Sequence, residues 1–178
     1  MLKQTVVALG LVLGIAATAF GQAQDTPYQV RFAANLKKSD AIRITNTGAN
    51  GGVAQGTKIC ASVYAFSPDG TMLDCCSCPV PPNGLVSLSI AQDVLADRRP
   101  RPKDVLLGVL ASSGSGGNCN AATVGSGDAL VTGMVAWKGE EKFAPATLSA
   151  SELSSVDTRC GILHVTANTC PACRPPQM

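Results

Sequence analysis

The stretch "LDCCSCPVPPNG" holds three cysteines within four residues, at Cys75, Cys76 and Cys78. The chain has eight cysteines in all, and the other five are Cys60, Cys119, Cys160, Cys170 and Cys173. An even number of cysteines in an exported chain is typical of a disulfide framework, so we predict that all eight form disulfides. Too many pairings are possible for the sequence to choose among them.

Two local features reduce the number of plausible disulfide pairings. Neighbouring side chains of an extended backbone point to opposite sides, so Cys75 and Cys76 should reach different partners. A chain end that finishes in "RPPQM" needs a tether to be ordered, so we expect Cys170 or Cys173 to join the cluster at 75–78.

The first residues predict export. Lys3 precedes an apolar run, 6–19, which is short for a membrane span and is followed by small residues. We predict a signal peptide over residues 1–23, with cleavage after Ala23; cleavage after Ala19 and an uncleaved anchor are the alternatives. Residues 24–178 have the length of one domain. We therefore expect a secreted, periplasmic or cell-surface protein with no membrane span after signal cleavage.

Two C-x-x-C pairs offer a different chemistry. Cys75 with Cys78 and Cys170 with Cys173 have the spacing of a four-cysteine zinc site. The "CPAC" motif could alternatively support thiol redox chemistry, but the prolines that follow it prevent the helix that such a motif needs. An oxidising compartment favours disulfides over free thiolates, so a zinc-binding or thiol-redox protein is the alternative hypothesis.

Short segments of alternating apolar and polar residues indicate a mainly β fold. The expected strands are 28–36, 41–48, 58–66, 71–76, 85–90, 104–111, 129–137 and 162–167. "SPDG" at 67–70 predicts a tight turn between two arms of a hairpin, and the prolines from Pro79 should end the second arm. The pattern predicts an antiparallel β-sandwich or partly open barrel, stabilised by disulfides.

One helix is expected, in the C-terminal region. Ser149 and Glu152 form the S-x-x-E pattern of a capping box, and Leu153 and Val156 share one face. Gly161 has the position of a C-terminal stop.

The net charge of the chain is close to zero. The chain has 14 Lys and Arg, and removal of Lys3 with the signal peptide leaves 13 against 12 acids. This near-neutrality gives no electrostatic case for nucleic acid or membrane partners, so we expect no nucleic acid. The basic run "RRPRPK" at 98–103 could bind an anion or be a processing site, but a solvated loop between strands is the interpretation that we favour.

No catalytic constellation is evident. His164 is the only histidine, and we expect it to be a surface or cross-strand side chain in the last strand. Nucleophile, phosphate-binding and metal-ligand motifs other than the cysteine pairs are missing, so we expect neither an enzyme nor a cofactor.

The cysteine-proline segment carries a resemblance. "CASVYAFSPDGTMLDCCSCPVPPNGLVSLS", the later "FAPATLSASELSSVDTRCG" and the terminal "CPAC" resemble segments of uncharacterised exported bacterial proteins. The resemblance implies bacterial export and a shared cysteine framework, and no activity or ligand comes with it.

These observations predict a binding or cell-envelope structural role. The partner is unknown, and self-association is a further possibility, in which the extended segment 24–36 would add a strand to a second copy.

Overall fold

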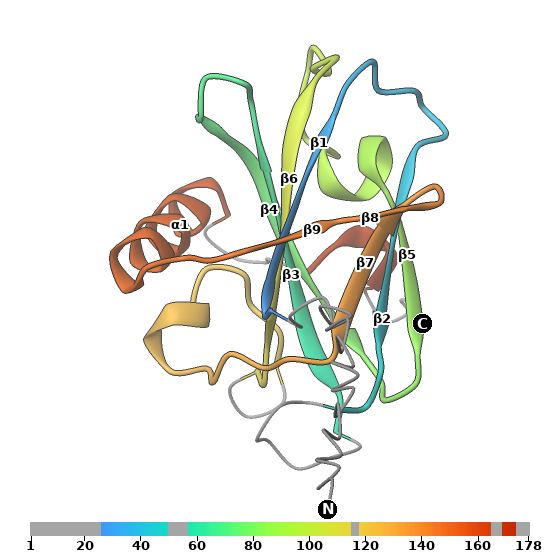
Figure 1. The fold of residues 1–178 in the computed structure, drawn as a ribbon. Helices are drawn as coiled ribbons and strands as arrows, with labels where there is room; N and C mark the ends of the chain where they lie inside the picture. Colours follow the sequence, from blue (N-terminus) through green and yellow to red (C-terminus); the bar gives the residue numbers. More distant parts are fainter. Residues whose placement is uncertain (1–25, 50–56, 115–117, 165–168, 174–178) are drawn as a thin grey trace, which may run out of the picture.

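Two antiparallel sheets form the computed structural model, which describes residues 26–49, 57–114, 118–164 and 169–173 (Figure 1). Sheet A has five strands in the order β4 (Met72–Val80), β3 (Ile59–Phe66), β6 (Val105–Ser112), β1 (Tyr28–Ala33) and β9 (Ala144–Ala146). Sheet B has four, in the order β5 (Leu85–Ser89), β2 (Ala41–Asn46), β7 (Met134–Lys138) and β8 (Glu141–Lys142). The predicted disulfide-stabilised β-sandwich is confirmed, whereas the predicted signal peptide lies outside the described residues.

The main core lies between the inner faces of the two sheets. Ile59, Ala61 and Val63 of β3 face it, opposite Ile42 and Ile44 of β2, and all five are at most 1% exposed. Alternate residues of β3 face the other way and are also buried, so this central strand is buried on both sides. A strand in this position is expected to be apolar throughout, which explains why 58–66 gave the strongest strand pattern.

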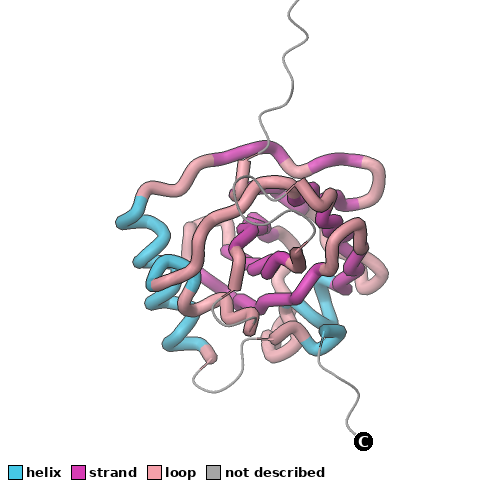
Figure 2. Tube along the Cα trace, turned by 90° about the horizontal axis from the view of Figure 1, so that it is seen from below, coloured by secondary structure: helices cyan, strands magenta, loops and turns pink. Residues whose placement is uncertain are grey.

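A third layer covers part of the outer face of sheet A. Helix α1 (Ala150–Leu163) lies outside the sandwich, and the loop that follows β6 lies beside it (Figures 1 and 2). Tyr28, Tyr64 and Leu110 of sheet A pack with Val156 of the helix in a second apolar cluster. Short helical turns complete the fold: a π-helix at Ile90–Val94 and 3-10 turns at Val124–Ser126 and Pro171–Cys173.

The segment predicted as one strand over 129–137 belongs to two sheets. Leu130 bridges to Ser112 at the end of β6, whereas Met134 begins β7 and pairs with β2. Gly133 lies between them with φ 91°, a left-handed conformation that glycine adopts without strain. The predicted strand 129–137 was therefore too long, because the chain crosses from sheet A to sheet B at this glycine.

Strand β4 runs further than predicted. It continues through Pro79 to Val80, although the prolines were expected to end it at residue 79. Proline has no N–H to donate, but β4 is an edge strand of sheet A, where proline is tolerated because an N–H that faces the open edge has no neighbouring strand to pair with. The turn between the two strands is as predicted, with Gly70 N donating to Ser67 O at 2.9 Å.

Helix α1 begins as predicted and ends later. Ser149 caps it, and both hydrogen bonds of the capping box with Glu152 are present. The helix passes through Gly161 to Leu163, so the predicted stop at Gly161 and the start of a strand at Ile162 were wrong. Leu153, Val156, Cys160 and Leu163 recur at helical spacing, and their packing on sheet A outweighs the helix-breaking tendency of one glycine.

The N-terminal segment pairs within its own chain. Strand β1 lies between β6 and β9, with Tyr28–Val30 paired on both sides. Tyr28–Val30 therefore have no free edge with which to add a strand to a second copy. Self-association by other surfaces stays a prediction. In the described part of the chain, no helix has the length and apolar character that crossing a membrane requires.

Candidate binding groove at the C-terminal end of helix α1

The cysteine cluster on β4 connects three separate parts of the chain. Cys75 is bonded to Cys160 of α1, Cys76 to Cys170 and Cys78 to Cys173. The fourth disulfide joins Cys60 of β3 to Cys119 in the long loop after β6. The disulfide prediction is thus confirmed, as are the separate partners of Cys75 and Cys76 and the tether of the chain end.

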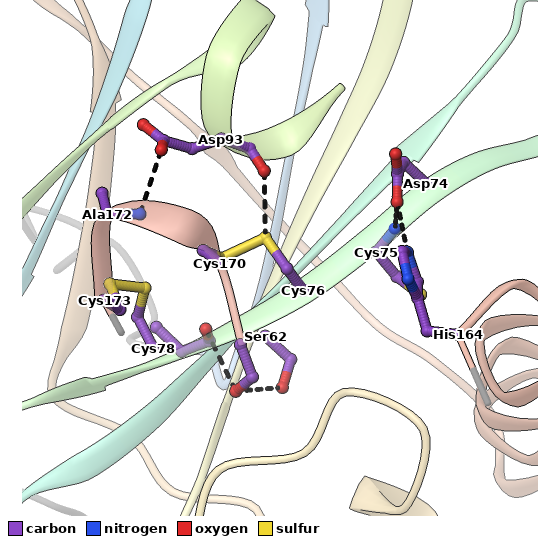
Figure 3. The surroundings of a disulfide bond; sticks show 12 residues. Ser62, Asp74, Cys75, Cys76, Cys78, Asp93, His164, Cys170, Ala172 and Cys173 are labelled. Atoms are coloured by element: carbon purple, nitrogen blue, oxygen red, sulfur yellow. Dashed lines mark hydrogen bonds and ion pairs between the residues drawn. A yellow bond between two sulfur atoms is a disulfide. The ribbon is translucent and has the colours of Figure 1, made fainter. Parts of the chain in front are cut away.

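Strand alternation explains the two directions of the cluster. Cys75 belongs to the outer apolar cluster of sheet A, together with Cys160 of the helix. Cys76 and Cys78 belong to the inner core, where the 170–173 segment meets them. Figure 3 shows the disulfides of Cys76 and Cys78 on one side of β4. The strand therefore connects the helix on one face and the chain end on the other.

Hydrogen bonds hold segment 169–173 beside the disulfides. Cys170 N donates to Ser77 O at 3.2 Å, and Thr169 forms a parallel bridge to Ser77. Ala172 N donates to the Asp93 carboxylate at 3.0 Å (Figure 3), and the same carboxylate accepts from Ser89 N at 2.8 Å. Segment 169–173 thus pairs with part of the open edge of β4, so less of this edge is left without a hydrogen-bonding partner.

The observed pairing gives no support to the zinc or redox alternative. Cys75, Cys78, Cys170 and Cys173 lie in three different disulfides, and neither C-x-x-C motif closes on itself. Thiol oxidoreductases cycle a disulfide within the motif. Among the described residues, no group of three or more His, Cys, Asp or Glu side chains is placed to hold a metal ion.

His164 lies at the end of the helix rather than in a strand. It is the C-cap of α1, and its N–H donates to Cys160 O at 3.0 Å. Its ring Nε2 lies 2.5 Å from Oδ1 of Asp74, whose side chain is 7% exposed (Figure 3). Asp74 also accepts a hydrogen bond from Cys75 N at 2.9 Å. The contact fastens the helix end to β4 one residue away from the Cys75–Cys160 disulfide.

Two hollows meet at this end of the helix. The larger has a volume of about 460 Å³ and lies between α1 and the β3–β4 turn, lined by Asp69, Gly70, Thr71, Met72, Arg159, Ile162 and Leu163. The smaller, of about 280 Å³, is lined by Asp74, Asp97, Arg98, Ile162, Leu163 and His164. Ile162 and Leu163 line both, so the two hollows adjoin, and together we call them the Ile162 groove.

Ile162 is the most exposed large apolar side chain in the described part of the chain, at 73%. It projects between an apolar end of the groove, with Met72, and a polar end, with Asp74 and His164. Isolated apolar side chains are common on protein surfaces, but one that borders a hollow can contact a ligand on several sides.

The rim of the groove is held in place. Arg159 donates to Gly70 O at 3.4 Å, which joins the helix to the β3–β4 turn. Arg98 donates through Nε to Leu73 O at the opposite rim. Hydrogen bonds from the Ser67 hydroxyl and Thr71 N lower the pKa of Asp69, so this carboxylate is ionised at neutral pH. The walls are thus fixed by a disulfide, an imidazole–carboxylate contact and two arginine–carbonyl bonds.

The chemistry of the groove favours binding. The lining residues that the structure describes include one hydroxyl side chain, Thr71, and it lies in the hollow that His164 does not line. The arrangement can receive an apolar group beside Ile162 and Met72, and can hydrogen-bond a polar group at Asp74, Arg98 or His164.

Sequence reasoning singled out some residues of this groove and missed others. The cysteines and His164 were named from the sequence, but Ile162 was expected to alternate within a strand, and Asp74 had no assigned partner. The recurrence of Leu153, Val156, Cys160 and Leu163 at helical spacing is the signal that would have extended the helix and placed Ile162 on its exposed side.

Comparison with known proteins gives no relative: no family model, no curated protein and no solved structure matches this chain. The resemblance to exported bacterial proteins therefore stays a prediction.

Proposed function

We propose that this protein is a disulfide-stabilised binding domain of the secreted, periplasmic or cell-surface space, and that the Ile162 groove is its ligand-binding surface. Four disulfides indicate an oxidising environment, and the β-sandwich supplies a rigid support. The observation that carries the proposal is the 73% exposure of Ile162 at the junction of two hollows whose walls are fixed.

The shape of the groove suggests the class of ligand. An apolar side chain or a short acyl group fits beside Ile162 and Met72, and its polar end would lie near Arg98 and His164. Because both arginines and three carboxylates line the groove, a partner with balanced polarity is favoured over a strongly charged one. A peptide segment with an exposed apolar residue has this character.

A neutral probe tests the groove without electrostatic bias. Indole is titrated into the oxidised, isotope-labelled protein, and backbone amide shifts are followed by NMR. We expect the shifts to concentrate on residues 69–72 and 159–164. Ile162→Asp should abolish them, whereas Leu85→Asp, at a side chain of similar exposure (58%) on β5, should leave them unchanged. Shifts that lie elsewhere, or that survive Ile162→Asp, would contradict the proposal.

A further inference from the structure

A second surface, which borders the Ile162 groove at Asp97 and Arg98, combines positive charge with exposed apolar side chains. The segments 35–40 and 97–104 are about sixty residues apart in the sequence, and both lie at the end of the molecule where β1 finishes and β6 begins (Figure 1). Leu36 N donates to Lys103 O at 2.8 Å, and Asn35 N donates to the Asp104 carboxylate at 2.9 Å. Lys37, Lys38 and Arg101 line one small hollow between the segments.

This pairing concentrates the charge of a nearly neutral chain. The two segments hold six cations, Lys37, Lys38, Arg98, Arg99, Arg101 and Lys103, against three acids, Asp40, Asp97 and Asp104. All of these cations except Arg98 are exposed. None of the exposed five forms a salt bridge in the described part of the chain.

Two of the three acids are already engaged. Asp40 accepts from Lys37 N at 3.2 Å and forms a salt bridge of 3.2 Å with Lys138, which belongs to β7. Asp104 accepts from Asn35 N. Of the three, only Asp97 is classed as exposed. The positive potential of the five exposed cations is therefore only partly compensated.

Lys37, Lys38, Arg99, Arg101 and Lys103, the five exposed cations, are called the basic cluster below. Apolar side chains adjoin it. Phe32 is 55% exposed and lies opposite Leu106, which is 37% exposed, in the β1–β6 register. Leu106 in turn lies opposite the half-buried Phe66 of β3. The three side chains form a row across the outer face of sheet A, and Phe66 at one end of the row packs against the apolar cluster that contains Val156 of α1. Leu106 follows Lys103 by three residues, so the row begins where the basic cluster ends.

We propose that the basic cluster and the Phe32–Leu106–Phe66 row together form a surface that docks on a lipid bilayer carrying anionic headgroups. Lysine and arginine bind lipid phosphates from the aqueous side, while exposed aromatic and leucine side chains enter the boundary between headgroups and acyl chains. A soluble polyanion would complement the cations but would leave Phe32 and Leu106 in water. The combination of the two side-chain classes therefore favours the bilayer.

Vesicle binding tests the proposal. The oxidised protein is sedimented with vesicles of phosphatidylglycerol and phosphatidylcholine in equal amounts, and with vesicles of phosphatidylcholine alone. We expect binding to the mixed vesicles that weakens at high salt, and little binding to phosphatidylcholine. No binding to the mixed vesicles would overturn the proposal.

Variants locate the surface. Arg99→Glu with Arg101→Glu should weaken partitioning about tenfold or more. The matched control is Arg43→Glu with Lys142→Glu, which makes the same charge change at two exposed positions of sheet B and should have a small effect. An equal loss in both variants would show attraction by net charge alone and would refute the site. If the first variant does not fold, Lys37→Glu with Lys38→Glu replaces it.

A second pair of variants separates lipid from other polyanions. Phe32→Ser should reduce vesicle binding several-fold, whereas Leu85→Ser, at a comparably exposed side chain near the opposite end of the sandwich, should not. Binding that Phe32→Ser leaves intact, and that dextran sulfate competes away, would identify a soluble polyanion as the partner and overturn the bilayer proposal.

Discussion

Sheets A and B are stabilised by different means. Every disulfide has one end in β3 or β4 of sheet A, whereas the strands of sheet B contain no cysteine. Sheet B is held without disulfides by fully buried side chains that it contributes to the shared core, among them Ile42, Ile44 and Leu88. Helix α1, which sheet A supports, buries only Val156, Asp157 and Cys160 of its 14 residues. Disulfides thus occur where peripheral segments have too little apolar surface to hold themselves in place.

Reduction of the disulfides should have the largest effect. Each bridge contributes ~2–4 kcal/mol. The loss of four is comparable with the whole free energy of unfolding of such a domain, about 5–15 kcal/mol. We expect reductant to unfold the protein and chelator to leave its thermal midpoint unchanged, as measured by circular dichroism. A protein that melts with chelator and ignores reductant would instead support the zinc alternative.

Sheet B should respond most to loss of core volume. Ile44→Ala removes a side chain that is 0% exposed, at a site where no disulfide holds the strand. A buried Ile→Ala replacement costs ~2–5 kcal/mol, because it loses apolar burial and leaves a cavity. Chemical denaturation of the oxidised variant measures this cost. A change below about 1 kcal/mol would mean that the disulfides of sheet A also support sheet B.

The cap residue of α1, Ser149, lies eleven residues before Cys160, so the start of the helix should depend on the cap. Ser149→Ala removes the acceptor for Glu152 N, and we expect a loss of about 1 kcal/mol in the free energy of unfolding. Ser155→Ala, at an exposed position of the same helix, is the matched control and should be neutral or slightly stabilising. Equal effects of the two replacements would show that the cap contributes nothing beyond helix propensity.

Asp157 should give the smallest effect, with a definite pH dependence. Burial raises the pKa of this carboxyl above its ordinary value of 3.8, and the hydrogen bond from Gly125 N, at 2.6 Å, only partly opposes it. The folded state therefore binds the proton more tightly than the unfolded state, so stability is lost as the pH rises through the raised pKa. Asp157→Asn removes the ionisable group and with it this pH-dependent loss of stability. The stability of the variant relative to the wild type should therefore increase from pH ~4 to pH ~7.

Glu152 supplies a control of opposite sign. Hydrogen bonds from the Ser149 side chain and backbone lower its pKa, so its contribution is present above its ordinary value of 4.5 and lost as the pH falls through the lowered one. Glu152→Gln should therefore lose stability relative to the wild type as the pH rises. Denaturation midpoints of both variants across this range check the two slopes, and a slope of the wrong sign in either variant would contradict the assignment of that residue.

Local signals determined much of this protein. Period-two alternation located most of the longer strands, the S-x-x-E pattern fixed the start of α1, and the adjacent Cys75 and Cys76 implied different partners, because each signal depends only on neighbouring residues. These features predicted a β-sandwich or partly open barrel and a disulfide framework before any pairing was known.

Only the tertiary structure decided the rest, because the relevant neighbours are distant in the sequence. Packing on sheet A stabilises α1 beyond Gly161, so that Ile162 lies on the exposed side of the helix. The crossing at Gly133 divides the predicted strand 129–137 between two sheets. The near-neutral net charge pointed away from membranes, yet the hydrogen bond from Leu36 to Lys103 brings two basic segments together. Net charge is a sum over the sequence, whereas a surface potential depends on where the fold places each charge.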